Sequence, residues 1–266
     1  MTDLSTRAPD GDGGAESEDR DGRENVDSHP ILRRLLPAMT AIPGLKVDRR
    51  TFLGKQLDRH YTQNSIEVGK AIATTPLAAG VPMATLDRMA DAIIMSHIVK
   101  ASSVSFAAGL PGGWLAAATV PADVAQLNWH AVVCAQKLMY LYGWDDLFED
   151  GDLQLNEETE VRIWLLVGAV FGVRTATDSL KEVAKASRSN AAYRIAKIRL
   201  TATPLYIPLR YALVRTIGVR LTKTSFAKGI GKLIPIAGGG ISASITAVSL
   251  RSMTRNLRGH LKEIAI

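Results

Sequence analysis

Cysteine is almost absent from this 266-residue chain, which contains Cys134 alone. A single cysteine cannot form an internal disulfide, so a disulfide-stabilised scaffold is excluded and nothing indicates an oxidising compartment. The sequence also lacks the His-Glu-x-x-His, Walker A and Gly-x-Ser-x-Gly patterns of common metalloprotease, nucleotide-binding and hydrolase sites. The sequence therefore specifies no reaction. Its length allows a core that folds without a disulfide or a structural metal.

Apolar residues are scarce in the first 28 residues, where Gly, Asp, Glu, Ser and Arg predominate. Residues 1–27 contain nine acidic and three basic residues, which gives a net charge of −6. Ordering such a segment would cost backbone entropy that no core contact offsets. We therefore expect a disordered acidic tail over residues 1–28, followed by one helical domain over residues 29–266.

Acidic residues are nearly missing from the other end of the chain. Residues 181–266 contain 16 basic residues against Glu182 and Glu263, which gives a net charge of +14. Basic and apolar residues interleave there, and this pattern favours contact with an anionic membrane surface. The candidate lipid-binding residues are Arg194, Lys197, Arg199, Arg210, Arg215 and Arg220. The alternative is that these residues form the solvated faces of packed helices.

Strands are not predicted anywhere, because no stretch sustains the alternation of apolar and polar residues that a half-buried strand needs. Apolar residues instead recur at helical spacing, and we expect helices over residues 49–74, 85–104 and 119–142. The last of these should have Pro121 in its first turn and Gly143 just beyond its end. The predicted fold class is all-α: a single compact multi-helix bundle whose glycine-rich helices pack closely.

Two stretches, 101–122 and 233–250, contain no charged residue. Each approaches the roughly 20 residues that cross a bilayer as a helix. Both are rich in small residues and contain proline, which makes insertion less favourable than for a leucine-rich span. We expect tightly packed helices, two short ones around Pro111-Gly112-Gly113 in the first stretch, and we retain re-entrant hairpins as the alternative.

Two segments carry a family resemblance. Pro121-Ala122-Asp123 precedes Gln136-Lys137-Leu138 and Tyr140-Leu141-Tyr142-Gly143-Trp144-Asp145, and a glycine-rich Ile234-Pro235-Ile236-Ala237-Gly238-Gly239-Gly240 follows later in the chain. This pattern resembles the EcsC protein family over residues 85–150 and 225–262. The resemblance implies a bacterial, helical protein, and the family is named from an operon that also encodes an ABC transporter. It supplies no catalytic residues.

Polar residues that could form a catalytic site occur on two of the predicted helices. Asp91 and His97 belong to the second helix, and Asp123 and His130 to the third. If the two helices pack antiparallel, these side chains could converge into a carboxylate–imidazole cluster that transfers protons or binds a metal. The opposing interpretation is structural, because an acid near a helix start favours the helix dipole and a buried histidine is commonly a core residue.

The sequence thus predicts a non-enzymatic, membrane-associated interaction or scaffold protein. Its basic C-terminal half would contact anionic lipid on the cytoplasmic face of the cell membrane. The alternative is a hydrolase-like or metal-dependent enzyme that uses the Asp/His cluster. We expect no cofactor and no resident metal, and we retain a protein partner as a possibility. Nucleic acid is not expected, because no helix-turn-helix, zinc-finger or single-strand-binding pattern accompanies the basic residues.

Overall fold

The computed structural model describes residues 30–61, 68–109, 115–149, 153–189, 198–204, 206–213 and 237–265. Every regular element in these ranges is helical, and none of them contains a strand. The predicted all-α fold class is therefore confirmed. The predicted disordered tail over residues 1–28 lies outside the described residues.

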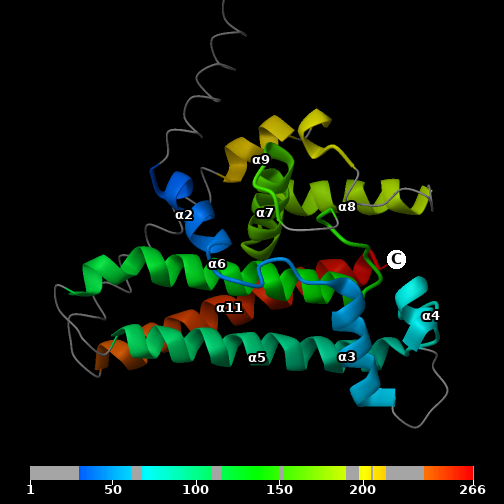
Figure 1. Ribbon diagram of the computed structural model, residues 1–266, viewed down its shortest axis with the longest axis horizontal. Helices are drawn as coiled ribbons and strands as arrows, with labels where there is room; N and C mark the ends of the chain where they lie inside the picture. The colour runs from blue at the N-terminus through cyan, green and yellow to red at the C-terminus, as the bar shows by residue number, and fades with distance from the viewer. Residues whose placement is uncertain are drawn as a thin grey trace, which may run out of the picture.

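Three long helices form the frame of the molecule (Figure 1). α5 (Met83–Gly109) and α6 (Leu115–Leu141) run antiparallel, and α11 (Ala237–Glu263) packs along α5 with the most extensive contact between any two described elements. α11 is also antiparallel to α5, since Lys262 near its end pairs with Asp87 near the start of α5. The C-terminal end of α5 therefore lies at the same end of the frame as the N-terminal ends of α6 and α11.

Three shorter helices from the first part of the chain lie against this frame. α2 (Pro30–Thr40) and α3 (Arg49–Tyr61) contact α6, and α4 (Val68–Ala73) packs on α3. The contact is apolar, because Met39 of α2 and Leu53 of α3 are fully buried. α2 lies on the side of α6 away from α5, and α3 and α4 lie at the end of the frame where α6 and α11 end (Figure 1).

A second group of helices reaches the frame through α7 (Glu157–Val170). α8 (Arg174–Ser189) follows α7. The short η2 (Leu200–Ala202) and α9 (Tyr206–Leu213) both pack against α7. No single described helix combines the length and apolarity of a membrane span. α7 and α8 meet that criterion only together, as a pair bent by 116°. All of α7 from Val161 onward is buried within the fold, which accounts for its apolar sequence.

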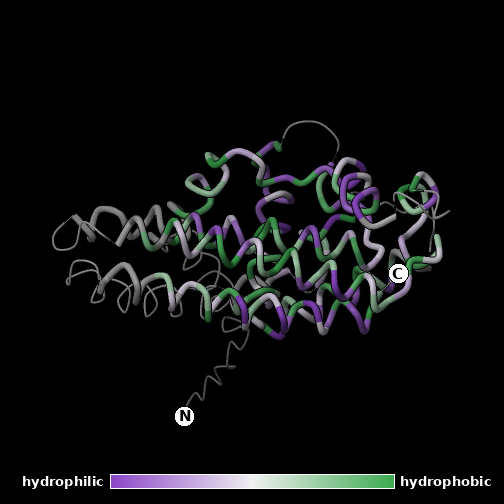
Figure 2. Tube along the Cα trace, turned by 90° about the horizontal axis from the view of Figure 1, so that it is seen from below, coloured by the Kyte–Doolittle hydropathy of each residue, from purple (hydrophilic) through white to green (hydrophobic). Residues whose placement is uncertain are grey.

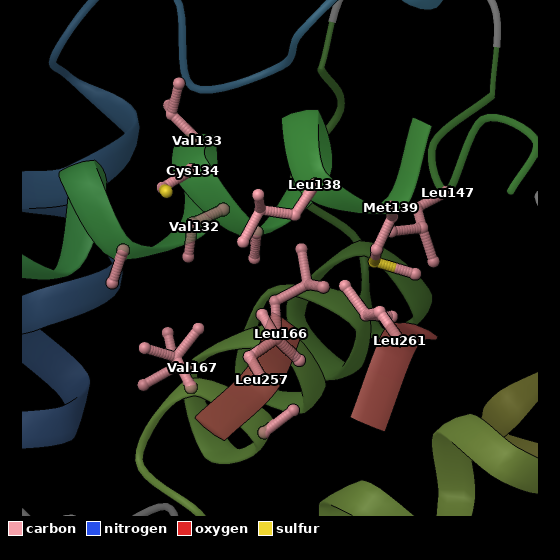
Figure 3. Packing of buried hydrophobic residues seen from close by; sticks show 14 of the residues in the cluster. Val132, Val133, Cys134, Leu138, Met139, Leu147, Leu166, Val167, Leu257 and Leu261 are labelled. Atoms are coloured by element: carbon pink, nitrogen blue, oxygen red, sulfur yellow. The ribbon is translucent and has the colours of Figure 1, made fainter. Parts of the chain in front are cut away.

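The main core lies between α6, α7 and α11. Figure 3 shows Leu138 and Met139 of α6 above Leu166 of α7, with Leu257 and Leu261 of α11 beside them. All five side chains are fully buried. Removing a side chain of this size from water contributes about 1.5–3 kcal/mol. Segments more than 100 residues apart in the sequence are therefore held together by this apolar contact.

The end of α6 forms where the sequence predicts it. Gly143 has φ +92°, a conformation that glycine adopts without a steric cost. Its N–H donates to the Tyr140 carbonyl at 3.3 Å, and the Trp144 N–H donates to the Met139 carbonyl at 3.0 Å. These bonds form a Schellman motif. The predicted start is wrong: the helix begins at Leu115, so Pro121 lies beyond its first turn.

The prediction of one helix over residues 49–74 is also wrong. That segment contains α3 and α4, which pack against each other. The buried Arg49 guanidinium, at the start of α3, donates to the carbonyl oxygens of Ile72 (2.7 Å) and Thr74 (2.9 Å) at the end of α4. It also donates to the Trp144 carbonyl at 3.0 Å, just after α6. One cation thus holds three chain segments together, an arrangement that hydrophobic periodicity does not reveal.

The uncharged stretch 101–122 does not form two short helices of its own. Residues 101–109 are the end of α5 and residues 115–122 are the start of α6. The predicted turn at Pro111-Gly112-Gly113 lies outside the described residues. Likewise, most of the stretch 233–250 continues into the basic segment after it as the single helix α11.

Replacing Arg49 tests its role in holding these segments together. Arg49→Leu should lower the free energy of unfolding by about 3 kcal/mol, because three carbonyl oxygens lose a charged donor. Urea denaturation measures the loss. Arg50→Leu removes the adjacent, exposed cation and should cost less than about 0.5 kcal/mol. Equal effects of the two substitutions would contradict this role.

Candidate functional site

The antiparallel packing of α5 and α6 brings together two of the four residues of the predicted Asp/His cluster. The Nδ1 atoms of His97 on α5 and His130 on α6 lie 3.0 Å apart. The rings meet edge to face, with centroids 5.3 Å apart. The side chains are 4% and 7% exposed, respectively. A direct imidazole–imidazole hydrogen bond is therefore buried between the two helices.

Lys137 extends this pair into a chain of three nitrogen groups. Its Nζ lies 3.0 Å from Nε2 of His97. A lysine ammonium can only donate, so Nε2 of His97 accepts and the proton of the neutral ring is on Nδ1. His97 then donates to Nδ1 of His130, whose own proton is on Nε2. The hydrogen bonds thus run in one direction, from Lys137 through His97 to His130.

Burial keeps both imidazoles neutral. It lowers the pKa of His97 to about 3, and the positive charge of Lys137 adds to the effect. It lowers the pKa of His130 to about 4, with a further contribution from Lys100. Burial also lowers the pKa of the Lys137 ammonium. Desolvation disfavours the charged form of each base, which explains why all three shifts have the same sign.

The two acids of the predicted cluster do not accompany the histidines in the described part of the chain. Asp91 forms an ion pair with Arg258 of α11. Six residues separate Asp91 from His97, and six residues correspond to about 240° of rotation around a helix, which places them on different faces. Asp123 lies on α6, and its side chain is outside the described part. The cluster of four is therefore not assembled among the described side chains.

The chain of three nitrogen groups has limited chemical capacity. Among the described residues, no group of three or more His, Cys, Asp or Glu side chains could hold a metal ion. The Lys137 ammonium beside His97 would also repel a cation. No described carboxylate orients either imidazole, as the triads of hydrolytic sites require. Its observed role is a polar connection between α5 and α6. Lys137 was missed from the sequence, although its position seven residues after His130 places both on one helix face.

Only part of the predicted lipid-binding set is described. Arg199 is exposed, directly before η2. Arg210 lies on α9, and its side chain is not described. The remaining members, which lie outside the described residues, are Arg194, Lys197, Arg215 and Arg220.

α11 presents basic residues that this set omitted. Lys262 donates to Asp87 at 2.6 Å, and Arg258 pairs with Asp91. These ion pairs use the acids of α5 that face α11. Arg251 and Arg255 are exposed, and neither forms an ion pair with a carboxylate of the described part. The excess positive charge of α11 is therefore concentrated in the middle of the helix.

Exposed apolar side chains lie close to these cations. Val99, Val104 and Phe106 of α5 are all more than 40% exposed, and Val248 of α11 is 70% exposed. The two ion pairs define the register of the antiparallel helices. A step of four residues forward along α5, from Asp87 to Asp91, matches a step of four residues backward along α11, from Lys262 to Arg258. Continuing that register places Val248 level with Ala101, between Val99 and Val104. The apolar side chains thus share one region of the molecule.

No family model, curated protein or solved structure matches this chain. The resemblance to the EcsC family therefore rests on the residues quoted for it.

The buried imidazoles predict a loss of stability in acid. Each has a folded-state pKa below its ordinary value of 6.5, so the unfolded chain binds protons that the folded chain does not. Their contribution is complete above pH 6.5 and falls as the pH decreases toward 4. Near pH 5 the free energy of unfolding should change by about 2.7 kcal/mol per pH unit, which corresponds to two protons.

Urea denaturation at a series of pH values measures this slope. His97→Gln combined with His130→Gln should remove most of it. A wild-type stability that stays flat between pH 7 and pH 5 would contradict the burial of two neutral imidazoles.

Proposed function

We propose that this protein is a non-enzymatic, membrane-associated interaction or scaffold protein on the cytoplasmic face of the cell membrane. Its basic C-terminal half contacts anionic lipid. The observation that carries the proposal is the position of Arg251 and Arg255, which are exposed and directly follow the uncharged half of α11. The resemblance to the EcsC family is part of the same proposal and concerns architecture alone.

The distribution of charged residues along α5 and α11 favours contact with an anionic membrane over a helix face that contacts only water. Asp87 and Asp91 neutralise Lys262 and Arg258, but no described carboxylate neutralises the next cations of α11. Lys100 of α5 is exposed at the same level as Ser249, two residues before Arg251. Each cation near an anionic leaflet contributes about 1 kcal/mol, so these three account for roughly a hundredfold in affinity.

The enzymatic alternative has less support. Of its four candidate residues, His97 and His130 are in contact, and their described partner is a lysine instead of an acid. Both imidazoles are buried, so neither offers a substrate an accessible base. The membrane proposal is therefore preferred because Arg251 and Arg255 are exposed and pair with no carboxylate among the described residues.

Charge reversal on α11 tests the proposal. Arg251→Glu combined with Arg255→Glu should weaken binding to vesicles of phosphatidylcholine and phosphatidylserine at least tenfold, because two attractions become two repulsions. Co-sedimentation at low salt measures the affinity, and added salt should release the wild type by screening.

The matched control is Arg50→Glu combined with Lys55→Glu on α3, which changes the net charge equally on exposed residues. It should leave vesicle binding within twofold of the wild type. If both pairs of substitutions weakened vesicle binding equally, binding would depend on the net charge of the protein and not on the position of Arg251 and Arg255. Wild-type protein that never sediments with anionic vesicles would overturn the proposed function.

A further inference from the structure

The line of contact between α5 and α11 changes from charged to apolar on its α5 side. It begins with two acid–base pairs one turn apart, of which Asp91–Arg258 is the second. The next positions of α5 at the same spacing of four residues are Met95 and Val99, and both are exposed. Neither side chain neutralises a cation. Figure 2 shows the same change along the frame, because purple turns continue toward the end marked C and the coloured turns at the other end are pale to green.

The α11 side of the same contact line stays basic. In the register that the ion pairs define, Arg255 lies level with the residue before Met95, and Arg251 lies level with the residue before Val99. Both arginines are exposed, and neither pairs with a carboxylate of the described part. Packed helices lie about 8–10 Å apart. Each arginine is therefore next to an apolar side chain of the neighbouring helix, where the preceding turns have an acid.

The apolar side chains at this contact line are exposed to an unusual degree. Met95 and Val99 are 48% and 56% exposed, and Val248, three residues before Arg251 on α11, is 70% exposed. Large apolar side chains gain free energy by leaving water, so a group of them on one surface indicates a contact. With the two arginines they form an apolar–basic patch, which consists of Met95, Val99, Val248, Arg251 and Arg255.

Helix rotation places the whole patch on one side of the frame. Two steps of four residues turn α5 by about 80° from Asp91 to Val99, away from the side of His97 that contacts α6. On α11 the patch residues lie within about 80° of Arg258, the partner of Asp91. Because α11 is antiparallel to α5, both rotations lead to the side away from α6. α2, α7 and α9 lie on the α6 side of the frame and do not cover the patch (Figure 1).

Exposed serines border the patch on the side away from the ion pairs. Ser103 lies one turn after Val99 and donates its hydroxyl to the Val99 carbonyl at 2.9 Å, so its polar group is satisfied within α5. Ser244 lies one turn before Val248 on α11. The patch is therefore confined to the middle of both helices. Its mixture of apolar, basic and hydroxyl groups fits the boundary between headgroups and acyl chains, and it does not fit the centre of the hydrocarbon.

The outer side of α5 continues this pattern toward the start of the helix. Ala92 and Arg88 precede Met95 by three and seven residues, so they lie on the same helix face, and both are exposed. From Arg88 to Val99 this face extends about 16 Å along the helix axis. A flat anionic surface contacts such a row of side chains along its whole length.

The charges indicate what covers the patch. A second copy of the chain would bring the acids of the same contact line, Asp87 and Asp91, but both already pair with cations of α11. The arginines therefore need an anion from outside the chain. An anionic leaflet supplies phosphates directly above an apolar layer, and arginine reaches the phosphates while its stem stays in apolar surroundings.

We propose that the apolar–basic patch of α5 and α11 lies flat on one leaflet of an anionic membrane, with both helix axes parallel to the membrane plane. Met95, Val99 and Val248 contact the upper part of the acyl chains, and Arg251 and Arg255 bind lipid phosphates. This inference rests on the proposed function and adds the face and the orientation of attachment.

Site-specific labelling of the full chain tests the orientation. Cys134 is fully buried and burial raises the pKa of its thiol to about 12, so it reacts slowly with thiol reagents. Ala92→Cys and Val99→Cys place environment-sensitive fluorophores on the proposed face, about 10 Å apart along α5. Val104→Cys is the matched control, because Val104 is also an exposed valine of α5 but lies two turns after His97, on the side that faces α6. Unmodified protein reports any background labelling.

Each labelled protein is mixed with phosphatidylcholine–phosphatidylserine vesicles that carry a nitroxide near the headgroup. Quenching of the labels at 92 and 99 should agree within twofold, because both lie at one depth. Each should be quenched at least twice as strongly as the label at 104. In co-sedimentation, Val99→Asp should weaken binding at least tenfold, and Val104→Asp, which changes the net charge equally, should leave it within twofold. Thermal unfolding of both variants checks that the fold is retained.

The failures of the two proposals are distinguishable. If the protein sediments with the vesicles but the labels at 92 and 99 differ by more than twofold, or the label at 104 is quenched as strongly as they are, the orientation is wrong and the proposed function stands. If sedimentation velocity shows a dimer that Val99→Asp dissociates, and the labels show no quenching, a second copy of the chain covers the patch and the inference is also wrong. If the protein does not sediment with anionic vesicles, the proposed function fails as well.

Discussion

The antiparallel packing of α11 on α5 is the constraint on which the rest of the structure depends. Asp87–Lys262 and Asp91–Arg258 mark its register, yet each pair is partly exposed and contributes about 1 kcal/mol or less. The buried leucines of α11, Leu257 and Leu261, add apolar contact with α6 and α7 in the main core. The ion pairs matter because they occupy Asp87 and Asp91, the acids of α5 that face α11. This charge placement leaves Arg251 and Arg255 without a carboxylate partner among the described residues.

Buried polar groups hold the frame to its neighbours. Arg49 connects α3, α4 and the end of α6 through three carbonyl oxygens, and His97 and His130 connect α5 to α6. Each group forms at least one hydrogen bond, because an unpaired polar group inside a core costs more than an apolar replacement. The histidines are explained by this connection, and their neutrality makes it sensitive to acid.

The sequence predicted the helical class and the end of α6, because hydrophobic periodicity and a glycine after the last turn are local signals. The prediction of one helix failed for residues 49–74, where long-range hydrogen bonds from Arg49 hold the start of α3 to the end of α4. At the site, antiparallel packing brought His97 and His130 together, but the partner of Asp91 lies 167 residues away on α11. Which acid meets which base depends on helix packing, and no local pattern records it.

Fractionation of the expressed protein into soluble, salt-extractable and detergent-requiring pools tests the central claim most directly. Attachment through the exposed cations of α11 predicts that the protein is found with membranes at low salt. High salt should release it, because salt screens the attraction between these cations and anionic lipid. A protein found entirely in the soluble pool at low salt would contradict the account.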